Sequence, residues 1–170
     1  MTYKKEWGMG MELKIPENFF VGAAMSGPQT EGAYKTGGRL ESIWDTWSDL
    51  SISDFYNKVG SYVGNNFYEK YEDDIKLLKS LHMDSFRTSM QWSRLLTKDG
   101  KLNQEGAQFY HKVCKCAKEN QIELFMNLYH FDMPTYLFER GGWESRDVVE
   151  AYAAYARAAF REFGSEIRYW

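Results

Sequence analysis

The sequence contains few cysteines and prolines, and it has no excess of basic residues. Its 170 residues include two cysteines and three prolines, and 21 Lys and Arg are set against 24 Asp and Glu. Without a basic surplus the chain lacks the charge that neutralises phosphate backbones, so we expect no nucleic-acid partner. No apolar run approaches membrane-spanning length, and no apolar stretch follows the lysines near the start. We therefore expect neither a membrane span nor a signal peptide.

The two cysteines, Cys114 and Cys116, lie two positions apart in a segment with helical spacing. Side chains at this spacing point to different faces of a helix and cannot form an unstrained disulfide with each other. No histidine or second cysteine pair completes a zinc-binding spacing. We therefore expect reduced, structural cysteines in a cytoplasmic protein, with no metal and no cofactor.

Aromatic residues, in contrast, are abundant. They make up 17% of the chain and include 12 tyrosines and six tryptophans. Such a content predicts either a large aromatic core or a wall for flat, partly apolar ligands such as sugars. The apolar and charged shares, 44% and 26%, are typical of a globular chain, and the length fits one domain over residues 1–170.

Short apolar runs alternate with segments of helical spacing. Buried strands are predicted at residues 18–26, 85–92 and 122–129, and helices at residues 65–83, 103–120 and 145–163. A long irregular connection is expected from Pro28 to about Asp54, and a fourth strand is expected to begin after Gly164. Alternation of this kind implies parallel strands with helical crossovers, either in an open doubly wound sheet or in the first units of a (β/α)8 barrel. The turn after the first strand has no G-x-G-x-x-G pattern, which disfavours a nucleotide-binding open sheet.

Functional groups gather where parallel strands end, in both of these folds. Gln29 follows the first predicted strand, Arg87 and Trp92 belong to the second, and His130 and then Trp143 follow the third. A guanidinium that points into a barrel needs a carboxylate, because a buried unpaired charge costs several kcal/mol. Taken singly, a glutamine can cap a turn and a histidine can lie in the core. Together these residues predict a polar pocket with aromatic walls, suited to a sugar.

The remaining polar residues predict no catalytic set. Glu31 is expected to begin a short helix rather than to catalyse, and His82 and His111 are placed on a helix end and an exposed helix face. No serine or cysteine has an identifiable base, and no pair of carboxylates has a spacing that suggests catalysis. The residue pattern alone therefore predicts the carbohydrate-binding half of a site.

Six motifs carry a more specific signal. They are GAAMSGPQTEGAY, SIWDTWS, YEDDIKLLKSL, SFRTSMQWSRLL, NLYHFDMPTYLFERGGWESR and YARAAFREFGSEIRYW. In this order they resemble the amino-terminal part of glycoside hydrolase family 1, the β-glucosidase-like barrels, from about Ile15 to Trp170. FRTSMQWSRL and LYHFDMP are similar to the 6-phospho-β-glucosidase branch. The resemblance implies an α/β fold of the TIM-barrel type, with residues 1–170 as the amino-terminal part of one domain: three βα units and the start of strand 4.

The resemblance also implies roles for single residues. Gln29 and His130 match the residues that bind the glycone, the sugar ring in the active site. Arg87 matches the arginine that contacts the nucleophile carboxylate and keeps it ionised, since a nearby cation lowers a carboxyl pKa. Phe131 stands where many β-glucosidases have tryptophan.

Phe131, Trp143 and Trp92 are the candidates for the wall of the pocket. The reaction implied for the complete enzyme is retaining hydrolysis of a phosphorylated β-glucoside by two carboxyl groups roughly 5–5.5 Å apart. In the family, one of these glutamates lies in an NEP motif at the end of strand 4, and the other lies near strand 7. Neither motif occurs in the 170 residues, so the chain alone is expected to be inactive.

A non-catalytic sugar-binding or interaction module, completed by a second polypeptide, is the alternative interpretation. Part of a barrel leaves open parallel edges and an interior face in water. Exposed edges and apolar patches drive association, so we expect self-association or pairing with a complementing fragment.

Overall fold

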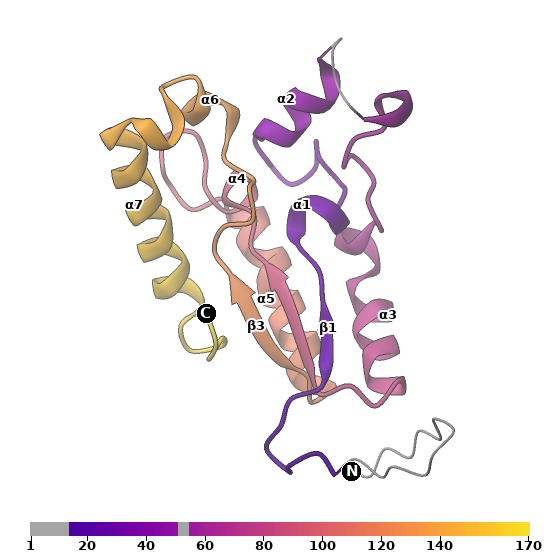
Figure 1. Ribbon diagram of the computed structural model, residues 1–170. Coiled ribbons are helices and arrows are strands. Elements are labelled where there is room, and N and C mark those ends of the chain that lie inside the picture. The colour runs from indigo at the N-terminus through magenta and orange to yellow at the C-terminus, as the bar shows by residue number, and fades with distance from the viewer. Residues whose placement is uncertain (1–13, 51–54) are drawn as a thin grey trace.

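A computed structural model describes residues 14–50 and 55–170 of the chain. Within these residues the sheet contains three parallel strands, β1 (Gly22–Ala24), β2 (Ser85–Ser89) and β3 (Glu123–Asn127), in the order β1-β2-β3 (Figure 1). Tyr169 forms a further parallel bridge with Phe125 of β3. The predicted parallel alternation is thus confirmed, and the chain after the last helix begins to pair where a fourth strand was expected.

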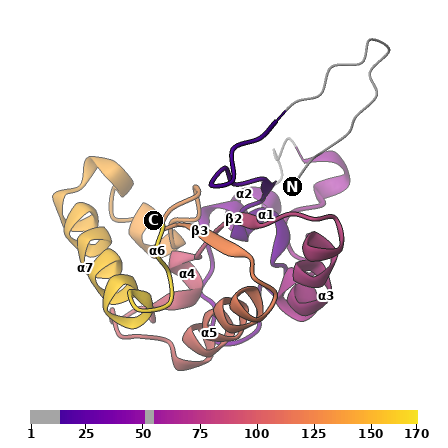
Figure 2. The same ribbon diagram turned by 90° about the horizontal axis from the view of Figure 1, so that it is seen from below.

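Three long helices cover one face of the sheet, as Figure 2 shows from below. They are α3 (Phe67–Ser80), α5 (Gln104–Glu119) and α7 (Arg146–Phe163), close to the predicted ranges. Leu124 and Met126 of β3 are buried toward these helices. Because side chains alternate along a strand, Phe125 points to the opposite, open face, where its ring stacks on that of Tyr169 at 4.6 Å.

The short helices lie at the carboxyl ends of the strands, at the top of Figure 1. They are α1 (Gly27–Thr30), α2 (Ile43–Asp49), α4 (Trp92–Leu95) and α6 (Thr135–Phe138), together with the 3-10 turns η1 (Tyr56–Lys58) and η2 (Gly142–Glu144). The expectation of an irregular connection over 28–54 was therefore wrong for α1 and α2, while residues 51–54 lie outside the described residues. A capping box starts α2, because the Asp45 carboxylate accepts the Ser42 N–H at 2.8 Å.

The first strand is shorter than the predicted range of 18–26. Only Gly22–Ala24 pair with β2, while Phe19 and Phe20 before them are exposed. The apolar run therefore predicted too long a strand, since Phe19 and Phe20 lie outside the hydrogen-bonded ladder.

Candidate functional site

The three residues predicted to hold a sugar belong to neighbouring strands or to the turns that follow them. Ala24, Arg87 and Phe125 are aligned across β1, β2 and β3 by the register of the parallel ladder. Gln29 lies in α1, directly after β1, and His130 follows β3 by three residues. Gln29 and His130 therefore lie beyond the carboxyl ends of their strands, where parallel strands carry their functional groups, and Arg87 lies in the middle of β2 between them.

His130 is half-buried and electrostatically coupled to Arg87. Partial burial and the positive charge of Arg87 both lower the pKa of His130 from its usual value. The imidazole is therefore neutral at pH 7, with one nitrogen as donor and the other as acceptor. Such a ring can bond two neighbouring sugar hydroxyls.

Arg87 and Gln29 keep polar groups available. Within residues 14–50 and 55–170, Arg87 forms no salt bridge with a carboxylate. Its guanidinium is thus free to meet a carboxylate that these residues do not supply. The Gln29 side chain is exposed, and its carbonyl oxygen accepts the Ser26 hydroxyl at 2.6 Å, which orients the amide while its NH2 group stays able to donate.

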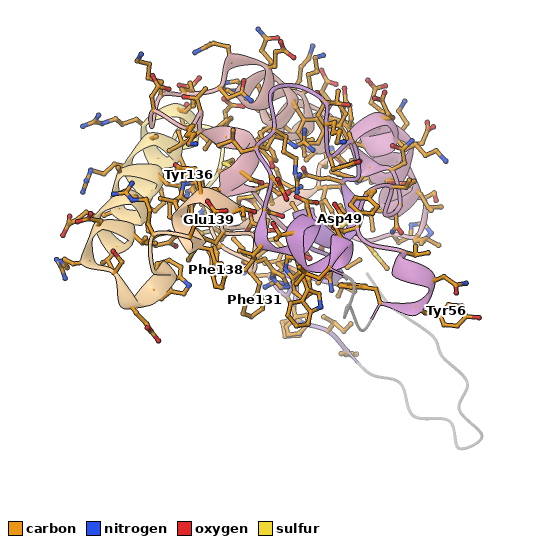
Figure 3. The ribbon with its side chains drawn as sticks, turned by 90° about the horizontal axis from the view of Figure 1, so that it is seen from above. Asp49, Tyr56, Phe131, Tyr136, Phe138 and Glu139 are labelled. Carbon is orange, nitrogen blue, oxygen red and sulfur yellow. The ribbon has the colours of Figure 1, made fainter. Side chains whose placement is uncertain are left out.

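The aromatic candidates divide into two groups. Phe131 and Trp143 are 59% and 45% exposed, and both rings meet Tyr129 edge to face, at 6.1 and 5.2 Å. Figure 3 looks onto this end of the molecule and shows Phe131 at its edge. Trp92 is 1% exposed and stacks on Tyr155 at 5.3 Å. Its place in the pocket wall is thus corrected: Trp92 supports the site from within the core.

A buried polar network that the sequence analysis did not predict lies under the β1 connection. The Glu31 carboxylate, at the end of α1, accepts hydrogen bonds from Arg94 at 2.7 Å, Gln91 at 2.6 Å and Tyr110 at 2.9 Å. Burial lowers the pKa of Arg94, but the nearby Glu31 carboxylate opposes this effect, and the pKa of Arg94 is raised overall. The expectation that Glu31 begins a short helix was wrong: Glu31 follows the last residue of α1, and its carboxylate holds the loop.

Gln91 connects this ion pair to a second one. Its carbonyl oxygen accepts Arg39 Nε at 3.0 Å, and Arg39 pairs with the buried Asp45 at 2.8 Å. Two ion pairs joined through one amide thus fasten the segment between Glu31 and α2 onto the residues after β2. No local sequence pattern predicts this network, because Glu31 and its partners Gln91 and Arg94 are about sixty positions apart in the chain.

His111 also has partners that the sequence did not reveal. Its ring nitrogens lie 2.6 Å from Glu166 and 3.0 Å from Glu162, so α5 is tied to the end of α7 and the turn beyond it. Partial burial opposes protonation, but the two glutamates raise the pKa of His111. This cluster lies away from the sugar-binding candidates and serves packing between helices.

Cys114 and Cys116 are both free and buried, and burial raises the pKa of the Cys114 thiol to about 12. Among the residues that the structure describes, no group of three or more His, Cys, Asp or Glu side chains is arranged to hold a metal ion. None of the described helices combines the length and apolar character needed to cross a membrane.

Known proteins resemble the chain in sequence and in structure. Residues 11–170 match the family model described as glycosyl hydrolase family 1. The 6-phospho-beta-glucosidase GmuD of Bacillus subtilis is 41% identical over 94% of this chain and 34% of its own length. Beta-glucosidase 9 of Arabidopsis thaliana is 40% identical over 92% of this chain and 30% of its own length.

Two solved structures have the same fold as this chain over most of its length. A rice beta-glucosidase superposes with a TM-score of 0.86 at 35% identity, over 91% of this chain and 33% of the rice chain. A beta-glucosidase of Exiguobacterium antarcticum superposes with a TM-score of 0.87 at 36% identity, over 91% of this chain and 35% of that one. The chain thus spans about a third of the length of these relatives. Its parallel sheet is the start of a TIM barrel, and the chain belongs to glycosyl hydrolase family 1.

Proposed function

We propose that this chain supplies the sugar-binding residues of a retaining glycosidase that acts on 6-phospho-β-glucosides. The observation that carries the proposal is the placement of Gln29, Arg87 and His130 on aligned neighbouring strands and the turns after them. A 6-phospho-beta-glucosidase at 41% identity suggests the phosphorylated substrate, while plain beta-glucosidases of similar identity share the family reaction. Phe131 at the rim is in keeping with that branch of the family.

The three residues have two tasks in this proposal. The amide of Gln29 and the neutral imidazole of His130 bond neighbouring hydroxyls of the sugar, and both can donate and accept. Arg87 stands close to His130 and meets the carboxylate that attacks the anomeric carbon. A cation beside that carboxylate lowers its pKa and so keeps it ionised for attack.

Hydrolysis itself needs two carboxyl groups that flank the glycosidic bond, one as nucleophile and one as acid and base. The 170 residues contain no Asn-Glu-Pro sequence. We therefore expect the isolated chain to bind a 6-phospho-β-glucoside without hydrolysing it. Turnover of a chromogenic 6-phospho-β-glucoside by the purified chain would overturn this part of the proposal.

A chimaera tests the function directly. Residues 11–170 replace the matching first third of the Bacillus 6-phospho-beta-glucosidase, and hydrolysis of 4-nitrophenyl 6-phospho-β-glucoside is measured. In the active chimaera, His130→Ala is expected to lower kcat/KM about 10- to 100-fold, since a hydrogen bond to the sugar is worth about 1–3 kcal/mol. His82→Ala, on the turn before β2 at the opposite end of the sheet, is the matched control and should leave kcat/KM unchanged.

Two results would contradict the proposal. If His130→Ala and His82→Ala have the same kcat/KM in the chimaera, His130 does not bind the sugar. A chimaera that hydrolyses the plain β-glucoside faster than its 6-phosphate would retain the family reaction but refute the phosphorylated substrate.

A further inference from the structure

The carboxylate of Asp132 lies buried between the ends of two strands. Its side chain is fully shielded from solvent. One oxygen accepts the Trp92 N–H at 2.7 Å, and the other accepts the His130 N–H at 3.2 Å. Within the described part of the chain it forms no salt bridge with a Lys, Arg or His. A single acidic side chain thus ties the turn after β3 to the residue that begins α4.

The turn that Asp132 closes is strained. Phe131 adopts the left-handed backbone conformation, with φ of 61°, which costs a residue with a side chain about 1–2 kcal/mol. Its own ring is 59% exposed, so packing of that ring does not hold the backbone in place. Strain of this kind persists only where the surrounding structure enforces it, and it gathers at functional sites.

Several contacts hold the chain around this turn. The Tyr155 hydroxyl lies 2.9 Å from both the Met90 and the Leu128 carbonyl oxygens and so joins the chain just after β2 and β3. Beyond Leu128, Asp132 accepts the amides of His130 and Trp92, and the next residue, Met133, is buried and accepts the Ile43 N–H at 2.9 Å. The His130 imidazole projects from the first residue of this turn, so its place beside Arg87 depends on the turn.

We propose that Asp132 is a positioning residue for sugar binding: its two amide contacts hold the left-handed turn that presents His130 beside Arg87. This inference rests on the sugar-binding role proposed above for His130. Asp132 is fully buried, so it acts through His130 and does not touch the ligand.

Asp132 changes its protonation state near neutral pH. Burial raises its pKa to about 7, although the amides of His130 and Trp92, and then Arg39, favour the ionised form. The other ionisable groups that face it are Glu31, which also raises its pKa, and the hydroxyls of Tyr129, Tyr152 and Tyr155. Hydrogen bonds to an ionised acceptor are about twice as strong as neutral ones. The turn is therefore held more firmly above pH 7 than below it.

Nuclear magnetic resonance of the uniformly 15N-labelled chain tests this role without any sugar. Between pH 5.5 and 8.5, the amide signals of His130 and Trp92 are expected to shift with one shared midpoint near 7. In Asp132→Asn this shared shift should be lost, and the His130 ring signals should move. Asp84→Asn is the matched control, because Asp84 accepts the Val21 N–H at 2.7 Å at the opposite end of the sheet. It should leave both His130 and Trp92 unchanged.

The outcomes separate this inference from the proposed function. Asp132→Asn that folds and leaves the His130 ring signals in place would overturn the role of Asp132 as a positioning residue. Amides of His130 and Trp92 that show no shared midpoint in the unsubstituted chain would overturn the pH response of the turn. If the pH response is as expected but 4-nitrophenyl 6-phospho-β-glucoside shifts no signal, Asp132 still sets the turn and the sugar-binding function fails.

Discussion

Replacing Glu31 with glutamine should lower the free energy of unfolding by about 3–5 kcal/mol, because it leaves a buried guanidinium without its counter-charge. Glu31 and Arg94 are 2% and 0% exposed and meet at 2.7 Å. The carboxylate also accepts hydrogen bonds from Gln91 and Tyr110. A glutamine presents an NH2 donor where one of these oxygens accepted, so a buried donor loses its partner.

The size of this loss is large compared with the stability of the domain. Folded domains are stable by about 5–15 kcal/mol, so a loss of 3–5 kcal/mol removes a major part. The loop loses its anchor as well, since Arg94 also donates to the carbonyl oxygens of Gly32 and Thr36 at 3.2 Å. Amide hydrogen exchange should therefore rise in the residues between Glu31 and α2.

The assay is urea unfolding followed by tryptophan fluorescence, at one protein concentration for all variants. The pair Asp99 and Lys101 provides the control, because its atoms also meet at 2.7 Å but both side chains are exposed. Asp99→Asn should leave the unfolding midpoint unchanged, since exposed ion pairs contribute little. The two ion pairs have the same distance, so the difference in their contribution to stability is expected to come from burial. Unfolding midpoints of Glu31→Gln and Asp99→Asn that lie equally close to the unsubstituted chain would refute the reasoning.

Three further predictions concern other parts of the chain. His111→Ala should destabilise the fold more at pH 5.5 than at pH 8.5, because a raised folded-state pKa stabilises below the unfolded value near 6.5 and is lost as pH rises through the folded pKa. Trp92→Ala should cost about 3–5 kcal/mol of unfolding free energy in urea, whereas Trp143→Ala should cost less and mainly weaken sugar binding. Sedimentation should show species larger than a monomer, and Phe20→Lys on the open sheet face should reduce them.

Each of these has a result that would contradict it. A loss of stability for His111→Ala that is at least as large at pH 8.5 as at pH 5.5 would contradict the first. Equal losses of stability for Trp92→Ala and Trp143→Ala would contradict the second, and a monodisperse monomer at micromolar concentration would contradict the third.

The three long helices and the strands could be predicted from the sequence, because their signals are local. The apolar spacing of α3, α5 and α7 and the apolar runs of β2 and β3 gave the right types in the right order. Tyr169 bridges Phe125, as the expected fourth strand requires. The choice between barrel and open sheet, however, came from motifs and not from periodicity, since both folds share the same alternation.

What could not be predicted depends on contacts between distant residues. The helix α2 was missed because it is short and exposes its tryptophans, although Ser42 and Asp45 carry the spacing of a capping box. Trp92 was misplaced because it was assigned to the second strand, whereas β2 ends at Ser89 and Trp92 begins α4 with its ring in the core. The partners of Glu31 and Asp132 lie some 40 to 63 positions away, or involve backbone amides that no side-chain pattern reveals.

The most direct measurement is a magnetic resonance titration of the side chains of Gln29, Arg87 and His130 with 4-nitrophenyl 6-phospho-β-glucoside. If these groups surround one sugar ring, the Gln29 amide, the Arg87 guanidinium and the His130 imidazole will shift together and saturate with one dissociation constant, while the His82 ring stays still. Signals that saturate at different concentrations, or that do not move while others do, would contradict a single shared binding site.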